Sequence, residues 1–177
     1  MARRLRPDYA KVSPGVVQAM LGLEQHLRQS GLDRRLLHLV KMRASLINGC
    51  SFCLNMHSQE AIRDGESPRR LFQLGAWEES PDFTPRERAA LAWTDAVTRV
   101  ADSRVPDSVY RHARQSFDPK ELADLTLAVV AINGWNRLAI AFRNPPEDLS
   151  HRAGRERKRV RAGTISRAVP TRVARLD

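Results

Sequence analysis

The chain has 177 residues and a formal net charge of +10, a length that suits one domain with its own hydrophobic core. Its apolar runs are far too short to cross a bilayer, which excludes a membrane-spanning protein. No segment alternates apolar and polar residues as a half-buried strand does. We therefore expect an all-α protein, a single-domain helical bundle of six to seven helices.

Most of the positive charge lies at the C-terminal end of the sequence. From Ser150 to Asp177 there are nine Lys or Arg residues and two acidic residues, so this segment carries +7 and the rest of the chain +3. The segment is poor in large apolar residues and is not expected to pack a core. The sequence thus predicts three regions: an N-terminal mobile arm over 1–12, a helical domain over 13–147 and a basic, disordered extension over 148–177.

Start and stop signals predict three helices in the first part of the domain. Ser13 and Pro14 supply an N-cap and a proline at the first helical position, and a Ser-Gly pair follows Gln29. Asp33 caps a second helix with a broad apolar face, and an Asn-Gly pair ends it. A third helix begins directly afterwards. The expected helices cover 13–29, 33–48 and 50–63.

The second part of the domain repeats one strong start signal. The sequences TPRE, at Thr84, and DPKE, at Asp118, each combine a cap, a proline and an acidic residue three positions after the cap. They open long helices over 84–102 and 118–143, the second of which is apolar enough to be a core element. Shorter helices are expected over 67–74 and 106–115, with a loop over 75–83.

The only two cysteines of the chain occur in the segment 36–60, LLHLVKMRASLINGCSFCLNMHSQE. Cys50, Cys53 and His57 have the spacing C-x-x-C-x-x-x-H, which places all three on one stripe of a helix. At a helix start, unpaired N–H groups and the helix dipole stabilise a thiolate, and a nearby imidazole adds to the effect. Such a pair can form a sulfenic acid and then a disulfide. The pattern predicts a reversible two-electron redox site that needs no cofactor.

Three other interpretations remain open at this point. A buried C-x-x-C pair can simply consist of two small apolar core residues. Cys50, Cys53 and His57 would also supply three zinc ligands, with His38 as a fourth, although the usual structural zinc site takes its second ligand pair from a separate loop or helix. Finally, the pair would sense redox state while the basic tail contacts a polyanion. Nucleic acid is not an expected partner, because no aromatic residue is interleaved with the tail arginines.

The N-terminal sequence MARRLRPDYAKVSPG has basic residues but no apolar stretch behind them, so it lacks the pattern of a secretory signal. We therefore expect a cytoplasmic protein that has no contact with a membrane. In that reducing compartment, a close cysteine pair is more often catalytic or metal-bound than a permanent cross-link.

Three blocks, LVKMRASLINGCSFCLNMHSQEA, FTPRERAALAWTDAVT and INGWNRLAIAFR, together resemble the carboxymuconolactone decarboxylase-like superfamily, specifically its alkylhydroperoxidase D-like branch. The resemblance covers about Tyr9 to Pro146. It implies a homo-oligomer, a trimer or hexamer, that reduces hydroperoxides and is recycled by a thiol reductant. It also implies that Cys53 attacks the peroxide, that Cys50 is its disulfide partner and that His57 relays protons. The helix dipole alone instead favours Cys50, which is closer to the helix start, as the nucleophile.

Two positions depart from the pattern of that branch. His38, twelve residues before the first cysteine, stands where the branch has a relay glutamate, and Phe52 stands where the well-studied peroxidase has a histidine. A histidine can also carry protons, so His38 joins the expected catalytic residues. Both departures predict a weaker or redirected peroxidase. The decarboxylase that names the superfamily acts without a cysteine pair, so the motif argues against that reaction.

Overall fold

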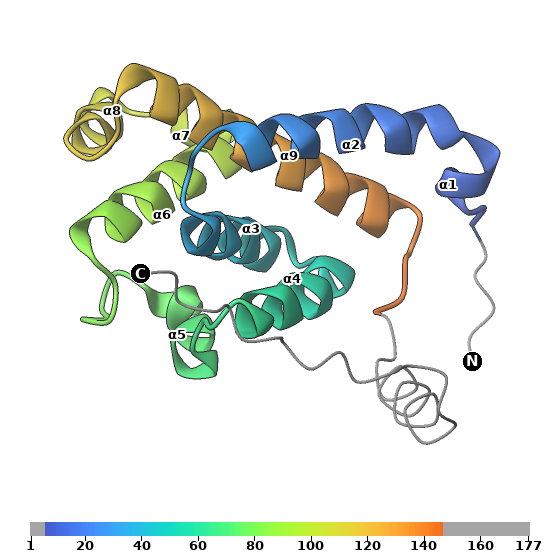
Figure 1. The fold of residues 1–177 in the computed structure, drawn as a ribbon, viewed down its shortest axis with the longest axis horizontal. Coiled ribbons are helices and arrows are strands. Elements are labelled where there is room, and N and C mark those ends of the chain that lie inside the picture. Colours follow the sequence, from blue (N-terminus) through green and yellow to red (C-terminus); the bar gives the residue numbers. More distant parts are fainter. Residues whose placement is uncertain (1–5, 147–177) are drawn as a thin grey trace, which may run out of the picture. The chain divides into compact units, whose positions relative to one another are not determined.

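A computed structural model describes residues 6–146 of the chain. Every regular element in this part is a helix (Figure 1), which confirms the all-α prediction. The extension expected over 148–177 lies outside the described residues. The elements in order are α1 (Tyr9–Val12), α2 (Pro14–Gln29), α3 (Arg34–Asn48), α4 (Ser51–Arg63), α5 (Pro68–Gln73), the 3-10 turn η1 (Leu74–Ala76), α6 (Pro85–Thr98), α7 (Val100–Ser103), α8 (Asp107–Arg114) and α9 (Pro119–Ala141).

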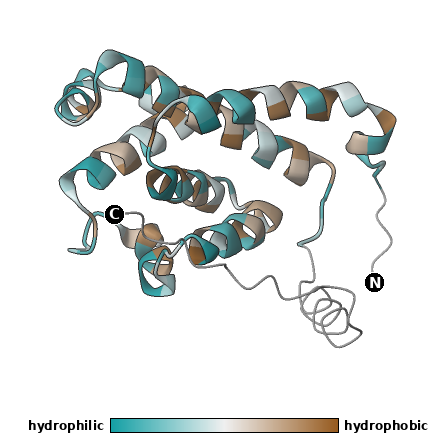
Figure 2. Cartoon of the chain, in the orientation of Figure 1, coloured by the Kyte–Doolittle hydropathy of each residue, from teal (hydrophilic) through white to brown (hydrophobic). Residues whose placement is uncertain are grey.

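The middle of the domain is α3, which packs against α4, α6 and α9 (Figure 1). Its apolar face supplies fully buried side chains such as Leu39 and Val40. Figure 2 shows the apolar residues of the helices turned mainly toward one another and the polar residues turned outward. Burial of these faces is the main source of the domain's stability, because isolated helices of this length are marginal in water.

Both start signals of the second half form as complete capping boxes. The Thr84 hydroxyl accepts a hydrogen bond from the Glu87 N–H, and the Glu87 carboxylate accepts one from the Thr84 N–H. Asp118 and Glu121 make the same reciprocal pair at the start of α9. These caps satisfy N–H groups that have no partner within the helix, so the predicted starts of α6 and α9 agree with the structure.

The structure differs from the sequence prediction at several element ends. The arm expected over 1–12 contains the helical turn α1, where Tyr9 is buried and its ring lies 5.3 Å from that of Phe142. The helix expected over 84–102 is divided at Arg99, whose φ of −100° and ψ of 35° leave the helical region, so that α7 forms separately. The loop expected over 75–83 begins inside the 3-10 turn η1.

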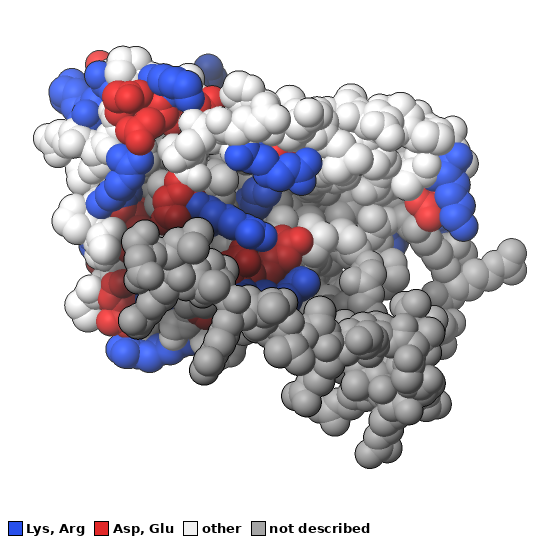
Figure 3. Space-filling model, in the orientation of Figure 1, with Lys and Arg blue, Asp and Glu red and all other residues white. Residues whose placement is uncertain are grey.

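The long helix α2 lies across α9 and closes one side of the domain (Figure 1). Gly134 on α9 allows this close approach, because a Cβ atom there would lie 2.9 Å from Cε of Met20. Within residues 6–146 no helix is long and apolar enough to span a membrane. On the face drawn in Figure 3, basic and acidic side chains are interspersed, in agreement with the small net charge expected for the domain.

Candidate active site

A glycine with a left-handed backbone conformation, between α3 and α4, positions the cysteine pair at the start of α4. Gly49 has φ 67° and ends α3, and the Cys50 N–H turns back to donate to the Ser45 carbonyl at 3.0 Å. Residues with a Cβ atom rarely adopt this backbone conformation, so glycine is the natural residue here. The sharp turn makes Cys50 the N-cap of α4 and leaves Cys53 in its first turn.

The two thiols are in direct contact. Both cysteines are free, each is only 1% exposed, and their Sγ atoms lie 2.6 Å apart. The Cys53 N–H also points at Cys50 Sγ, at 3.4 Å. The helix start therefore directs an N–H group at Cys50, and the two sulfur atoms have the proximity that a C-x-x-C redox pair requires.

The pair shares one negative charge unequally. The Cys53 thiol donates a hydrogen bond to Cys50 and lowers the pKa of Cys50 to about 7, against the opposing effect of burial. The same hydrogen bond, followed by burial, raises the pKa of Cys53 well above its ordinary value. Near neutral pH the charge therefore resides on Cys50 and the proton on Cys53.

A group of amide side chains from α9 lies behind the cysteines. Asn136 is fully buried, donates to Ser45 Oγ at 3.1 Å and accepts from Asn48 Nδ2 at 2.8 Å. Asn48 Nδ2 also contacts Oδ1 of Asn133 at 3.0 Å. Asn136 lowers the pKa of Cys50 in addition to the larger effect of Cys53. These amides hold the end of α3 against α9 and so fix the turn that carries Cys50.

His57 lies one helical turn after Cys53 and is 4% exposed. Its Nδ1 atom lies 2.8 Å from Oε2 of Glu60, one turn further along the same helix. This contact with His57 is the main reason that the pKa of Glu60 is below its usual value. The other ring nitrogen, Nε2, is buried and has no hydrogen-bond partner among the described residues. A buried nitrogen of this kind is available to a bound molecule.

Sequence analysis missed Glu60. The H-x-x-E spacing of His57 and Glu60 is a signal that could have revealed the pair, because residues three apart face each other on a helix. Asn136 belongs to the block INGWNRLAIAFR, but the sequence did not indicate that its side chain contacts the end of α3. Its contact with Ser45 joins residues 91 positions apart, which helix periodicity alone does not predict.

His38, the fourth expected site residue, has a different partner. Its Nε2 atom lies 2.6 Å from Oδ2 of Asp64, which also accepts from Arg34 at 2.8 Å. The contact with His38 is the largest of the effects that lower the pKa of Asp64. His38 and His57 line one pocket, but each is paired with a different carboxylate. The role of His38 in proton relay stays a prediction.

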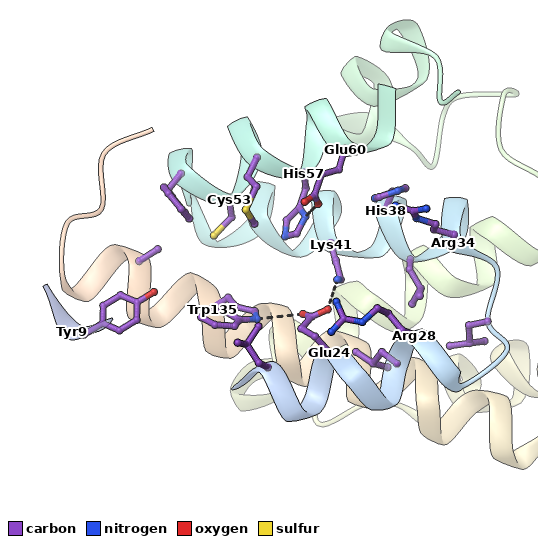
Figure 4. A pocket seen from close by; sticks show the side chains of 17 residues that line it. Tyr9, Glu24, Arg28, Arg34, His38, Lys41, Cys53, His57, Glu60 and Trp135 are labelled. Carbon is purple, nitrogen blue, oxygen red and sulfur yellow. Dashed lines mark hydrogen bonds and ion pairs between the residues drawn. The ribbon is translucent and has the colours of Figure 1, made fainter. Parts of the chain in front are cut away.

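Three of the four expected site residues, Cys53, His57 and His38, line a pocket of about 750 Å³ between α2, α3 and α4, to which α1 and α9 also contribute (Figure 4). Cys50 is not part of the lining. The apolar lining consists of Tyr9, Leu21, Leu27, Leu32, Leu37, Phe52, Met56, Trp135 and Ala139. The polar lining beyond His57 consists of Glu24, Arg28, Arg34, His38, Lys41 and Glu60. A pocket with apolar walls and a few placed polar groups suits a small organic molecule.

Glu24 crosses from α2 to two other helices at this pocket. One carboxylate oxygen lies 2.7 Å from Nζ of Lys41 on α3, and the other accepts from Nε1 of Trp135 on α9 at 3.2 Å (Figure 4). Glu24 and Lys41 are both largely buried. These two contacts join α2, α3 and α9 at the pocket wall.

The zinc interpretation finds no support in the arrangement of side chains. Between residues 6 and 146, no three His, Cys, Asp or Glu side chains form a group suited to a metal ion. His57 contacts Glu60 and His38 contacts Asp64, so the two histidines do not join the two thiols as a fourfold ligand set.

Comparison with known proteins identifies the family. The model of the carboxymuconolactone decarboxylase family matches residues 14–96. The uncharacterized protein YdfG of Bacillus subtilis (strain 168) is 37% identical over 139 residues, which are 78% of this chain and 95% of YdfG. The chain belongs to the carboxymuconolactone decarboxylase family. The expected superfamily is thereby confirmed.

Solved structures of similar proteins extend the comparison. A protein of unknown function from Agrobacterium tumefaciens, suggested to be an antioxidant defence protein AhpD, is 44% identical with a TM-score of 0.78. The match covers 80% of the present chain and 97% of the Agrobacterium chain. The debrominase Bmp8 has a TM-score of 0.70 at 18% identity, over 78% of this chain and 74% of its own. At that identity the likeness to Bmp8 concerns the fold alone.

Proposed function

We propose that the protein is a thiol peroxidase that reduces organic hydroperoxides through Cys50 and Cys53. One observation carries the proposal: two free thiols are in contact, and one of them lines a pocket together with His57, whose Nε2 has no hydrogen-bond partner within residues 6–146. The resemblance to the alkylhydroperoxidase D-like branch supports it, as does the suggested antioxidant role of the Agrobacterium relative.

In the proposed first step, Cys53 attacks, because it lines the pocket whereas Cys50 lies behind it. At rest the Cys53 thiol donates to Cys50, which raises the pKa of Cys53. When the hydroperoxide binds, Cys53 exchanges this hydrogen bond for one to Nε2 of His57 and transfers its proton there, and the resulting thiolate attacks the terminal oxygen of the hydroperoxide. The O–O bond breaks, Cys53 becomes a sulfenic acid, and the departing alkoxide takes the proton from His57 and leaves as an alcohol.

In the second step, Cys50 resolves the sulfenic acid. In the reduced pair the pKa of Cys50 is about 7, so Cys50 enters the cycle substantially as a thiolate at neutral pH. Its sulfur attacks Cys53 Sγ and displaces hydroxide, which leaves as water after protonation. Two thiols are oxidised to a disulfide and one peroxide is reduced. A dithiol reductant must return the pair to its starting state, which suits a reducing compartment such as the cytoplasm.

Glu60 assists both proton transfers in this scheme. Its carboxylate holds Nδ1 of His57 at 2.8 Å, so that Nε2 faces the pocket, and it stabilises the imidazolium that forms in the first step. This role resembles that of the relay glutamate of the alkylhydroperoxidase D-like branch, whose position is occupied by His38 on α3. In this protein the carboxylate that contacts His57 comes from Glu60 on α4.

The proposal is tested by adding one equivalent of cumene hydroperoxide to the reduced protein and recording the intact mass. We expect the loss of two hydrogen atoms and of both titratable thiols. Cys53→Ser should abolish peroxide consumption. Cys50→Ser is the matched control: it should consume one equivalent and stop at a sulfenic acid that dimedone traps.

Two results would contradict the proposal. Peroxide consumption by Cys53→Ser at the rate of the wild type would remove Cys53 as the nucleophile. A native mass raised by one zinc ion, with both thiols protected from peroxide, would favour a metal site at Cys50 and Cys53.

A further inference from the structure

Nearly all ionisable side chains that line the pocket have a hydrogen-bond or ion-pair partner. Lys41 pairs with Glu24 at 2.7 Å, and Arg34 pairs with Asp64 at 2.8 Å, so these two cations are neutralised inside the protein. His57 contacts Glu60 at 2.8 Å, and His38 contacts Asp64 at 2.6 Å. A bound molecule therefore meets little free positive charge from Lys41 and Arg34.

Arg28 is the exception among the described residues. It lines the pocket from α2, its side chain is exposed, and it has no hydrogen bond or ion pair with any residue of 6–146. It lies one helical turn after Glu24, about 6 Å further along the helix axis. Figure 4 shows Glu24 and Arg28 on α2 facing the same space as Cys53 and His57 on α4.

The pocket wall around Cys53 is apolar. Phe52 and Trp135 pack against the buried cluster that contains Cys53. Met56 lies three residues after Cys53 on α4 and also lines the pocket, as do Leu21 on α2 and Leu37 on α3. The cavity of about 750 Å³ exceeds what hydrogen peroxide or a methyl hydroperoxide would fill. A long apolar chain would bury its surface against these residues, which favours binding by about 25 cal/mol per Å² of apolar area.

We propose that the pocket binds an amphipathic organic acid, with its apolar chain along the Phe52, Met56 and Trp135 wall and its carboxylate on Arg28. The planar guanidinium presents two parallel N–H donors that match the two carboxylate oxygens. As applied to the substrate, a hydroperoxide of such an acid, the inference rests on the proposed function. The binding of the acid itself does not.

Binding is measured with decanoate and its neutral counterpart decan-1-ol, on the reduced full-length protein. Trp135 lies in the pocket wall and reports occupancy by fluorescence, and Trp135→Phe verifies that the signal arises there. In the wild type we expect saturable binding of both. Arg28→Gln should weaken decanoate binding by about three- to tenfold, the range of an exposed charge-assisted contact, and leave decan-1-ol binding unchanged.

Arg111→Gln is the control variant, because it removes the same positive charge from a residue that is exposed on α8 and lies outside the pocket lining. It should leave the decanoate to decan-1-ol affinity ratio at its wild-type value. Two results would overturn the assignment to Arg28. In one, Arg28→Gln has the same decanoate to decan-1-ol affinity ratio as the wild type. In the other, Arg111→Gln lowers this ratio as much as Arg28→Gln does. Glutamine is a good helix former, so Arg28→Gln should keep α2 intact.

A kinetic comparison separates this inference from the proposed function. A fatty acid hydroperoxide and its methyl ester differ in charge and by one methyl group, and cumene hydroperoxide serves as a short neutral reference. We expect kcat/KM for the acid, but not for the ester, to fall about three- to tenfold in Arg28→Gln. Turnover of the ester and the acid with no effect of Arg28 would overturn the inference and leave the peroxidase. Failure of all three substrates would overturn the peroxidase, while the decanoate titration still decides the binding site.

Discussion

At the scale of single residues, His57 and Glu60 show how one helix can supply both an imidazole and the carboxylate that orients it. Residues three apart on α4 face each other, and the 2.8 Å contact orients the imidazole without help from another element. His38, on α3, is 2.6 Å from Asp64 and lacks a comparable contact with His57. The structure thus gives separate carboxylate partners to two histidines that the family resemblance places in one proton relay.

This division makes a test of Glu60 and His38 informative. Glu60→Gln keeps the size of the side chain but removes the charge that stabilises the His57 imidazolium, so we expect kcat/KM for cumene hydroperoxide to fall about ten- to a hundredfold. Glu60→Asp, which keeps a carboxylate, should recover part of the loss. His38→Gln should have the smaller effect. An equal loss in Glu60→Gln and His38→Gln, measured by stopped-flow kinetics, would return the relay to His38.

The cysteine pair predicts an unusual titration. The pKa of Cys50 is about 7 because Cys53 donates to it, and the pKa of Cys53 is raised. Thiolate absorbance should therefore show one thiolate forming near pH 7, and the second thiol should stay protonated through the range in which a free cysteine ionises. Cys53→Ala removes the donor and should move the Cys50 midpoint toward the ordinary value of 9.0. A single two-thiol step near pH 9 would contradict the shared proton.

The same shifts give a sign to the pH dependence of stability. Between about pH 7 and 9 the folded protein has lost the Cys50 proton while the unfolded chain retains it, so the free energy of unfolding rises with pH. Above pH 9 the unfolded chain releases both protons but folded Cys53 retains its own, so the free energy falls again. The contribution of the pair should peak near pH 9. Cys50→Ala with Cys53→Ala, compared by chemical denaturation, should lack this peak.

At the scale of elements, the turn between α3 and α4 needs a residue with positive φ, and the same turn sets the position of Cys50. Gly49, at φ 67°, should resist replacement: Gly49→Ala should lower the free energy of unfolding by about 1 kcal/mol. Gly22→Ala is the matched control, since Gly22 lies within α2 with no atom near its Cβ position, and should gain about 1 kcal/mol. Equal shifts in urea denaturation would contradict this account.

The sequence predicts helices well where local chemistry determines their ends. The caps at Asp33, Thr84 and Asp118 and the left-handed Gly49 are local signals, and the structure forms each of them. The break at Arg99 has no glycine or proline to announce it, and Tyr9 is ordered by a ring contact with Phe142, 133 positions away. Such contacts depend on the packed fold, which helix periodicity does not contain.

The candidate site divides in the same way. C-x-x-C-x-x-x-H identifies Cys50, Cys53 and His57 because all three belong to one short segment, and these residues do meet at one place. The pocket itself needs α2 to cross α9, so Glu24, Arg28 and Trp135 could not be assigned to it from their spacing. Sequence patterns locate the reactive atoms here, and tertiary packing determines what can reach them.

At the scale of the whole molecule, apolar side chains remain on the surface of the domain. Val130 and Ile140 are about half exposed on α9, although ten of the 23 residues of that helix are buried. Phe72 on α5 is 86% exposed, and Val12 and Val100 are more than half exposed. Contacts between subunits commonly cover surplus apolar surface of this kind.

We expect the protein to be a homo-oligomer, as its resemblance to trimeric and hexameric proteins also implies. Light scattering should give about 60 or 120 kDa, three or six times the chain mass of 20.0 kDa. A chain truncated after Pro146 should form an oligomer with the same number of subunits, because the exposed apolar residues belong to the helical domain. Val130→Glu would place a charge on this surface and should reduce the mass if α9 lies at the interface. A mass of 20.0 kDa for the full chain at every concentration would contradict the assembly and leave these side chains exposed to water.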